Sequence, residues 1–189
     1  MKILFLDNDG VICLSNNWGS RYKKQRKFYT YSNPRPLNSE IPCELKFDNF
    51  DKKAIKVLNQ IIELTDVEIV VSSDWRFHAN LEELGEYYIS QGIIKKPISF
   101  TPKVLNSGLP FYYRDTEFEE TRSYEIKDWL KEHPEVTHWV AVDDLDMKER
   151  FGDISGNYQW GLKNFVHTPI SSEGIKQSGI KEKILSFLN

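Results

Sequence analysis

The sequence is poor in cysteine, since Cys13 and Cys43 are its only two among 189 residues. Proteins that depend on disulfides carry many more, and this pair lacks the spacing of a metal site, so we expect free thiols in a reducing compartment. Long apolar runs are missing as well. The early run from Ile3 to Leu6 stops at Asp7, too soon for a signal peptide, and no stretch of about 18 apolar residues could cross a membrane. We therefore expect a cytoplasmic protein without a membrane partner.

An excess of positive charge is also lacking. The 25 lysines and arginines are outnumbered by 28 aspartates and glutamates, which gives a net charge of −3. The composition therefore does not indicate a nucleic-acid binder, and any such binding has to come from a local patch. With 189 residues, of which 40% are hydrophobic, the chain can bury a sizeable core, and we treat residues 1–189 as a single domain.

Apolar segments of two kinds alternate along the chain. Short continuous runs are typical of strands buried on both faces, and longer segments repeat their apolar residues at helical spacing. We predict strands at 3–6, 67–71, 138–142 and 164–167, and a short one around Ile98. We predict helices at 80–91, 123–132 and 180–188, and one more helix that is capped by Asp48 or Asn49. This alternation predicts an α/β fold with a doubly wound, mostly parallel sheet and helices on both of its faces.

Two stretches interrupt the alternation, and we predict them to be insertions. Residues 93–121 are irregular and punctuated by prolines. Residues 15–49 mix basic with aromatic side chains: Arg21, Lys23, Lys24, Arg26 and Lys27 with Trp18, Tyr22, Phe28, Tyr29 and Tyr31. Cations can meet a nucleic-acid backbone while rings stack on bases, so this segment suits a partner that carries phosphates and bases. The alternative is a solvated excursion whose rings pack on the domain.

The first strand ends at two acids, Asp7 and Asp9, followed by Gly10. In open α/β sheets, ligands bind outside the carboxyl ends of the strands. Two ionised carboxylates there repel each other unless a cation lies between them, and Mg²⁺ favours carboxylates together with phosphate oxygens. Gly10 would let the backbone turn sharply and approach a phosphate. The alternative is an ordinary polar turn, because Asp, Asn and Gly are also the commonest turn residues.

Two later strands end in side chains that suit the same chemistry. Ser72 and Ser73 follow the second buried strand, where a hydroxyl can donate to a phosphate oxygen, and the sequence leaves open which of them does so. Arg76 offers a planar fork of donors to the same anion. Asp143 and Asp144 follow the third buried strand and repeat the acidic pattern of the first.

Arg122 precedes the helix that we predict from Ser123. The N-terminus of a helix already carries partial positive charge and favours anions over cations. A bound phosphate would remove this conflict, so Arg122 is a candidate anion ligand. The alternative is that its side chain is simply exposed to water.

With these residues in view, the chain resembles the haloacid dehalogenase (HAD) superfamily. Four landmarks come in the order of that superfamily: Asp7-Asn-Asp-Gly10, Ser72, Arg122 and Asp143-Asp144. Within it, the chain looks most like the HAD domain of Swiss Army Knife RNA repair proteins, on the patterns Ser72 to Arg76, Thr101-Pro102, 122–130, Trp139 and Gly174-Ile175. The resemblance implies a Rossmann-like HAD sheet, with residues 15–49 as a flap or small cap.

The resemblance also implies a role for each landmark. Asp7 would attack phosphorus and form an aspartyl-phosphate, while Asp9 would act as general acid and then as general base. Ser72 would hold a phosphoryl oxygen, and Arg122 would neutralise the nucleophile and the phosphate. Mg²⁺ would be bound by the acids at two strand ends: Asp7, the Asp9 carbonyl and Asp144, with Asp143 in support.

We therefore expect a Mg²⁺-dependent phosphomonoesterase of the HAD type that acts on phosphorylated RNA or DNA ends or on nucleotides. One alternative is a phosphatase for small metabolites, in which residues 15–49 would form a lid. Another is a non-catalytic module that only binds phosphate. Such a module could dispense with its acid pair, but both Asp7 and Asp9 are present.

Overall fold

The computed structural model describes residues 1–29, 41–103, 118–151 and 159–189. At its centre lies a sheet of five parallel strands in the order β3-β2-β1-β4-β7. These strands are β1 (Lys2–Leu6), β2 (Glu68–Val71), β3 (Ser99–Phe100), β4 (His138–Asp143) and β7 (Phe165–His167). The predicted doubly wound parallel sheet is confirmed, with small differences at the strand ends.

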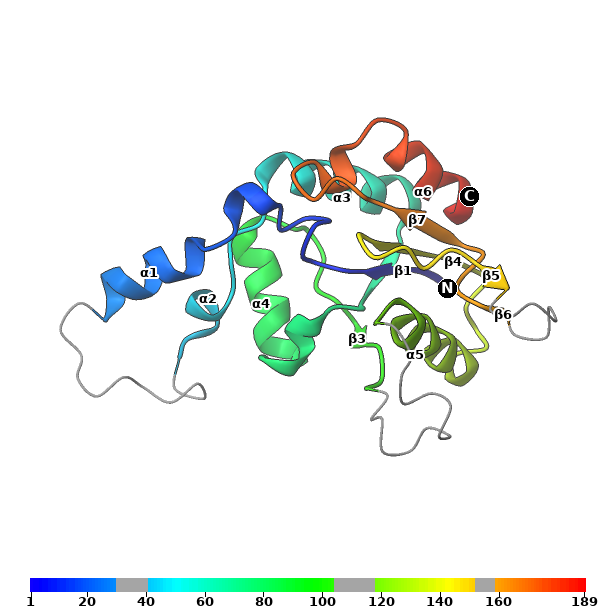
Figure 1. Cartoon of the computed structure of the whole chain (residues 1–189), viewed down its shortest axis with the longest axis horizontal. Coiled ribbons are helices and arrows are strands. Elements are labelled where there is room, and N and C mark those ends of the chain that lie inside the picture. The colour runs from blue at the N-terminus through cyan, green and yellow to red at the C-terminus, as the bar shows by residue number, and fades with distance from the viewer. Residues whose placement is uncertain (30–40, 104–117, 152–158) are drawn as a thin grey trace.

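Helices cover both faces of this sheet (Figure 1). On one face, α3 (Lys52–Thr65) and α6 (Ile180–Leu188) share an apolar cluster with strand residues such as Leu4. On the other face lies α5 (Phe118–Glu132), whose Trp129 ring meets Phe5 edge-on with 5.3 Å between centroids. Successive residues of a strand point to opposite faces, so continuously apolar strands supply both layers of the core.

The start of α3 differs from the prediction. The cap is Asp51, whose carboxylate accepts the N–H groups of Lys53 and Ala54 at 3.0 and 2.9 Å. The sequence suggested Asp48 or Asn49 instead, because Asp and Asn are equally good capping residues and the pattern does not separate them.

The helix α4 (Leu81–Gln91) has the ends that its sequence predicts. Asn80 accepts the N–H of Glu83 while the Glu83 side chain accepts the N–H of Asn80, which is a capping box. Gly92 ends the helix with a φ of 98°, a left-handed conformation that glycine adopts without strain.

The helix α5 begins earlier than predicted, at Phe118 rather than at Ser123. Its first turn contains Glu119 and Glu120, which favour the positive end of the helix dipole. Arg122 therefore lies inside the helix, and the interpretation that it precedes the helix start was wrong. The irregular stretch predicted at 93–121 falls partly outside the described residues, and its last part belongs to α5.

The basic and aromatic segment contains regular structure that the pattern did not predict. It forms the 3-10 turn η1 (Ser15–Asn17) and the helices α1 (Ser20–Phe28) and α2 (Cys43–Lys46). The helix α1 has no buried residue, so it lacks the apolar stripe by which helices are recognised in a sequence. In Figure 1, α1 and α2 lie beyond the end of the sheet at which β1 finishes. Tyr31 and the rest of residues 30–40 lie outside the described part.

Polar contacts attach α1 to the segment that leads into α3. Asp48 accepts the N–H of Arg21 at 2.7 Å and the Ser20 hydroxyl at 3.2 Å. The Lys24 ammonium donates to the Phe47 carbonyl and to Asn49 Oδ1 at 2.8 and 3.0 Å. One lysine of the basic cluster is therefore occupied in holding the helix.

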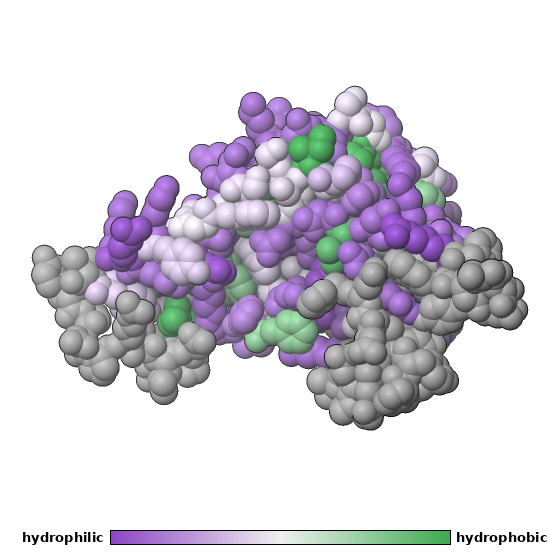
Figure 2. Space-filling model, in the orientation of Figure 1, coloured by the Kyte–Doolittle hydropathy of each residue, from purple (hydrophilic) through white to green (hydrophobic). Residues whose placement is uncertain are grey.

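A small antiparallel pair, β5 (Arg150–Phe151) and β6 (Gln159–Trp160), lies apart from the main sheet. The surface is largely hydrophilic in the view of Figure 2, where hydrophobic residues form separate small spots. Among the residues that the structure describes, no helix has both the length and the apolar character needed to span a membrane.

Candidate active site

The register of the sheet brings the chain-distant polar residues to one edge. Leu6 of β1 pairs with Val71 of β2 and with Val142 of β4, so the three strands end side by side. The N–H of Asp7 donates to the Val142 carbonyl at 3.1 Å, and the N–H of Ser72 donates to the Leu6 carbonyl at 2.9 Å. The residues after these strands therefore share one edge, as expected for parallel strands.

Three carboxylates converge at this edge. Asp7, Asp143 and Asp144 each offer an oxygen, and these atoms all lie within 4.8 Å of one another. Burial raises the pKa of Asp7 well above its ordinary value, and the charge of Asp143 adds to this effect. Burial likewise raises the pKa of Asp143 to about 6. A divalent cation would relieve this repulsion, and three carboxylate oxygens are ligands that Mg²⁺ accepts.

Arg122 supplies positive charge to the same cluster. Its Nη1 donates to Asp7 Oδ1 at 2.8 Å, to Asp143 Oδ2 at 3.2 Å and to the Ser72 carbonyl at 2.9 Å. Its Nη2 donates to Asp74 Oδ1 at 2.9 Å. Although burial opposes its charge, Asp7 and Asp143 raise the pKa of Arg122. The sequence pointed to Arg122 for a wrong reason, and it missed Asp74, which follows the serine pair.

Ser72 and Ser73 carry hydroxyls that have no hydrogen-bond partner in the structure. Both residues are 1% exposed, and both Oγ atoms are buried. Buried polar atoms are nearly always paired, so an unpaired hydroxyl next to a cationic and acidic cluster fits a site that a phosphoryl group completes. The structure does not separate the two serines as phosphate ligands, and both stay predictions.

Gly10 contributes to the site because it has no side chain. Its φ is 68°, and a side-chain carbon at this position would lie 2.2 Å from Asp144 Oδ2. Glycine is therefore required both for the turn and for the approach of Asp144. The Gly10 N–H already donates to the Cys13 carbonyl at 3.0 Å, and the predicted approach of its backbone to a phosphate stays a prediction.

Asp9 stands apart from the three clustered carboxylates. Its Oδ2 accepts the indole N–H of Trp75 at 2.7 Å. The Trp75 ring is stacked on Phe47 and Phe50, with centroids 4.3 and 5.3 Å away and interplanar angles of 9° and 18°. Burial raises the pKa of Asp9, while the Trp75 hydrogen bond opposes the rise. Trp75 carries no catalytic signal of its own in the sequence, because an aromatic residue after a strand is usually a core residue.

The Arg76 guanidinium has two partners inside the protein, Thr101 and Glu125. Its Nη1 donates to Thr101 Oγ1 at 2.7 Å and its Nη2 to Glu125 Oε2 at 2.5 Å, and the residue is 4% exposed. This buried ion pair uses the fork that was expected to meet the substrate. In the structure Arg76 links Thr101, which follows β3, to Glu125 of α5, and its role as a phosphate ligand stays a prediction that these contacts do not favour.

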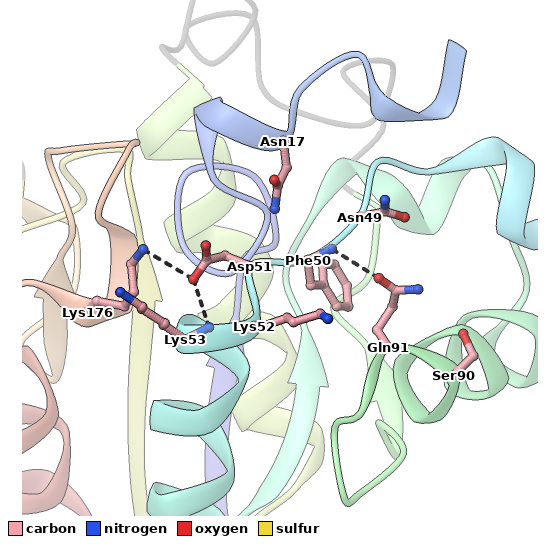
Figure 3. A pocket seen from close by; sticks show the side chains of 9 residues that line it. All are labelled: Asn17, Asn49, Phe50, Asp51, Lys52, Lys53, Ser90, Gln91 and Lys176. Carbon is pink, nitrogen blue, oxygen red and sulfur yellow. Dashed lines mark hydrogen bonds and ion pairs between the residues drawn. The ribbon is translucent and has the colours of Figure 1, made fainter. Parts of the chain in front are cut away.

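A separate cavity of about 680 Å³ lies at the N-terminus of α3 (Figure 3). Lys52, Lys53 and Lys176 line it together with amide side chains. Asp51 already caps the helix and pairs with Lys176 at 3.2 Å, so the positive end of α3 is satisfied within the protein. This cavity lacks the convergent acids and unpaired hydroxyls of the cluster around Asp7.

Comparison with known families agrees with the geometry. A family model described as "HAD domain in Swiss Army Knife RNA repair proteins" matches residues 3–177. No curated protein and no solved structure gives a significant match. The matched range includes the strand ends that carry the three acids and both serines, and it includes Arg122 of α5.

Proposed function

Because this chain belongs to the family of HAD domains in Swiss Army Knife RNA repair proteins, we propose that it is a Mg²⁺-dependent phosphomonoesterase for phosphorylated nucleic-acid ends or nucleotides. The observation that supports this most is the convergence of Asp7, Asp143 and Asp144 within 4.8 Å at the sheet edge where Ser72 and Ser73, with buried and unpaired hydroxyls, follow β2. The residues fit a hard divalent ion, because each offers a carboxylate oxygen. When bound, Mg²⁺ would neutralise charge on the phosphoryl oxygens and on Asp7.

In the proposed first step, an Asp7 carboxylate oxygen attacks phosphorus while the bond from phosphorus to the leaving oxygen breaks. Asp9 gives its proton to that leaving oxygen. Arg122 holds Asp7 Oδ1 at 2.8 Å and brings its positive charge to the reacting phosphate. Ser72 or Ser73 donates its free hydroxyl to a phosphoryl oxygen.

In the second step, water attacks the aspartyl-phosphate and Asp9 removes its proton. The bond between phosphorus and the Asp7 oxygen breaks, which releases inorganic phosphate and restores the carboxylate. Asp9 can serve in both steps because it ends the first step without its proton. Its hydrogen bond from Trp75 would keep the carboxylate in one orientation throughout.

The test of this function is phosphate release with and without Mg²⁺. The substrates are an aryl phosphate, oligonucleotides with 3′-, 5′- or 2′,3′-phosphates, nucleotides and sugar phosphates. A nucleic-acid end-processing enzyme should lose affinity steeply as salt rises, because it works through phosphate contacts. A mild salt response together with a preference for sugar phosphates would favour a metabolite phosphatase. Binding without any release would favour the non-catalytic module.

Mg²⁺ is expected to stabilise the folded protein. A ligand present at 100 times its dissociation constant adds about 2.7 kcal/mol, which is about 5–10 °C in Tm for a chain of this size. Asp144→Asn should abolish most of this increase, because it removes one of the three converging carboxylates. Thermal denaturation with and without Mg²⁺ measures the effect, and the surface variant Asp128→Asn serves as the control. An equal increase in Asp144→Asn and wild type would exclude Asp144 from the metal site.

Trp75→Phe is expected to move the alkaline limb of the kcat/KM pH profile to higher pH. The indole N–H stabilises the ionised Asp9 carboxylate and opposes the rise of its pKa, so its removal lets the pKa rise further. Asp9 must carry a proton to act as general acid, and it would then keep that proton to higher pH. The matched control is Trp129→Phe, which loses an indole hydrogen bond to Ser99 at 2.9 Å on the α5 face. Identical shifts in the two variants would contradict a specific action on Asp9.

A further inference from the structure

A second cavity, of about 600 Å³, lies between the α1–α2 insertion and the 3-10 helix η3 (Asp74–Phe77). Its walls include Arg21 and Tyr22 from α1, Lys46 from α2, and Phe77 and His78 from the opposite side. The volume falls in the range of about 300–1,000 Å³ that is usual for small-molecule sites. None of the steps proposed above uses this cavity.

Its two walls meet at the residues that hold Asp9. Phe47, which follows Lys46, stacks on Trp75 at 4.3 Å, and Trp75 donates to Asp9 at 2.7 Å. Phe77 lies two residues after Trp75 in the same 3-10 helix. The two segments that line the cavity therefore also supply the ring pair that contacts the general acid. Since Asp9 gives its proton to the leaving oxygen, the leaving group has to lie on this side of the site.

The walls carry aromatic rings that are available to a ligand. Tyr22 and Phe77 are 54% and 50% exposed, so part of each ring can meet a ligand. Arg21 Cζ lies 5.0 Å from the Tyr22 ring centroid, and Lys103 Nζ lies 4.4 Å from that of Phe77. Among the described residues that line the cavity, none carries a carboxylate. Exposed rings beside cations suit a flat π-bearing group that also carries phosphate.

We propose that this cavity is a nucleobase subsite that binds the leaving-group nucleoside of the substrate, with Tyr22 and Phe77 as its stacking surfaces. The proposal rests on the phosphatase function proposed above and narrows its substrate class. A sugar phosphate has no π-face and would leave both rings exposed. A nucleotide would stack its base on one of the rings while its phosphate stays at Asp7 and Arg122.

The first experiment measures binding without catalysis. Asp7→Asn protein with Mg²⁺ is titrated calorimetrically with a nucleoside monophosphate and with glycerol phosphate. Adding Phe77→Leu or Tyr22→Leu to this protein should weaken nucleotide binding about 5- to 100-fold, the range for one lost base–aromatic stack. Leu64→Ala, at an exposed apolar residue of α3, is the control. Unchanged nucleotide binding in both ring variants would overturn the subsite.

The second experiment compares kcat/KM for the same two substrates in the single variants. Phe77→Leu should lose at least fivefold more on the nucleotide than on glycerol phosphate, because only the nucleotide has a base to stack. Equal losses on both substrates would overturn the subsite while leaving the phosphatase intact. If neither substrate is hydrolysed by wild type, the proposed function fails, and the calorimetric result still decides whether the cavity binds a base.

Discussion

Asp7→Asn is expected to lower phosphate release by at least about a thousandfold, because it removes the atom that forms the covalent intermediate. Asparagine has nearly the same shape, so the backbone bond from Asp7 to Val142 at 3.1 Å should remain. The substitution also removes one of three clustered acids that repel each other, of which Asp7 and Asp143 are buried. We therefore expect the variant to fold and its Tm without metal to change little.

Phosphate release from an aryl phosphate with Mg²⁺ measures this effect. Asp128→Asn makes the same chemical change on the surface of α5 and controls for it. A quenched wild-type reaction analysed by peptide mass spectrometry should carry phosphate on the peptide that contains Asp7. Equal rates in Asp7→Asn and wild type would remove Asp7 from the mechanism.

Arg122→Met is expected to lower the free energy of unfolding by about 3–5 kcal/mol at neutral pH, because breaking a buried ion pair leaves uncompensated charge. The Arg122 side chain is 10% exposed and touches Asp7 and Asp143, which are 5% and 1% exposed. Activity should also fall about 100- to 1,000-fold, the usual effect of losing a donor that stabilises charge in a transition state. Arg122→Lys should restore part of the stability and part of the activity, since lysine keeps the positive charge but cannot form the second guanidinium hydrogen bond to Asp74.

The loss of stability in Arg122→Met should shrink as the pH falls. Burial already raises the pKa of Asp143 to about 6 in the presence of Arg122, and removing the cation raises it further. The folded variant then binds more protons than the unfolded chain, so its stability falls as pH rises and returns as pH drops below about 6. Urea denaturation at pH 5 and pH 7.5 measures this.

A double variant separates the charge effect from lost packing. Asp7→Asn should be less destabilising in Arg122→Met than in wild type, because the acid no longer has its cation and its removal then relieves repulsion. Two results together would show that lost packing explains the loss of stability. The difference in free energy of unfolding between Arg122→Met and wild type would be the same at both pH values, and the effects in the double variant would be additive.

The sequence by itself determined the layered fold and the strand ends. Continuous apolar runs such as Ile3 to Leu6 indicate strands buried on both faces, and parallel strands place the residues after them at one edge. This is why Asp7, Ser72 and Asp143 could be grouped from the chain alone. The helix at 80–91 was equally visible, because its pattern depends on residues close in sequence.

Only the tertiary structure decided how the side chains around these strand ends are paired. Arg122 was found through the start of a helix that in fact begins at Phe118, and Arg76 proved to be held by Glu125. Neither contact has a local signal, because the partners are far apart in sequence. The helix α1 escaped prediction for a related reason, since it buries no residue and therefore shows no apolar stripe.

The hydrogen bond from Trp75 to Asp9 best illustrates the difference between what the sequence determines and what the tertiary structure decides. Local pattern sets which segments become strands and helices, because backbone geometry repeats with a fixed period. Which ring reaches which carboxylate depends on how the α1–α2 insertion packs Phe47 against Trp75. That contact joins segments distant in the chain, and so it exists only once the sheet has been assembled.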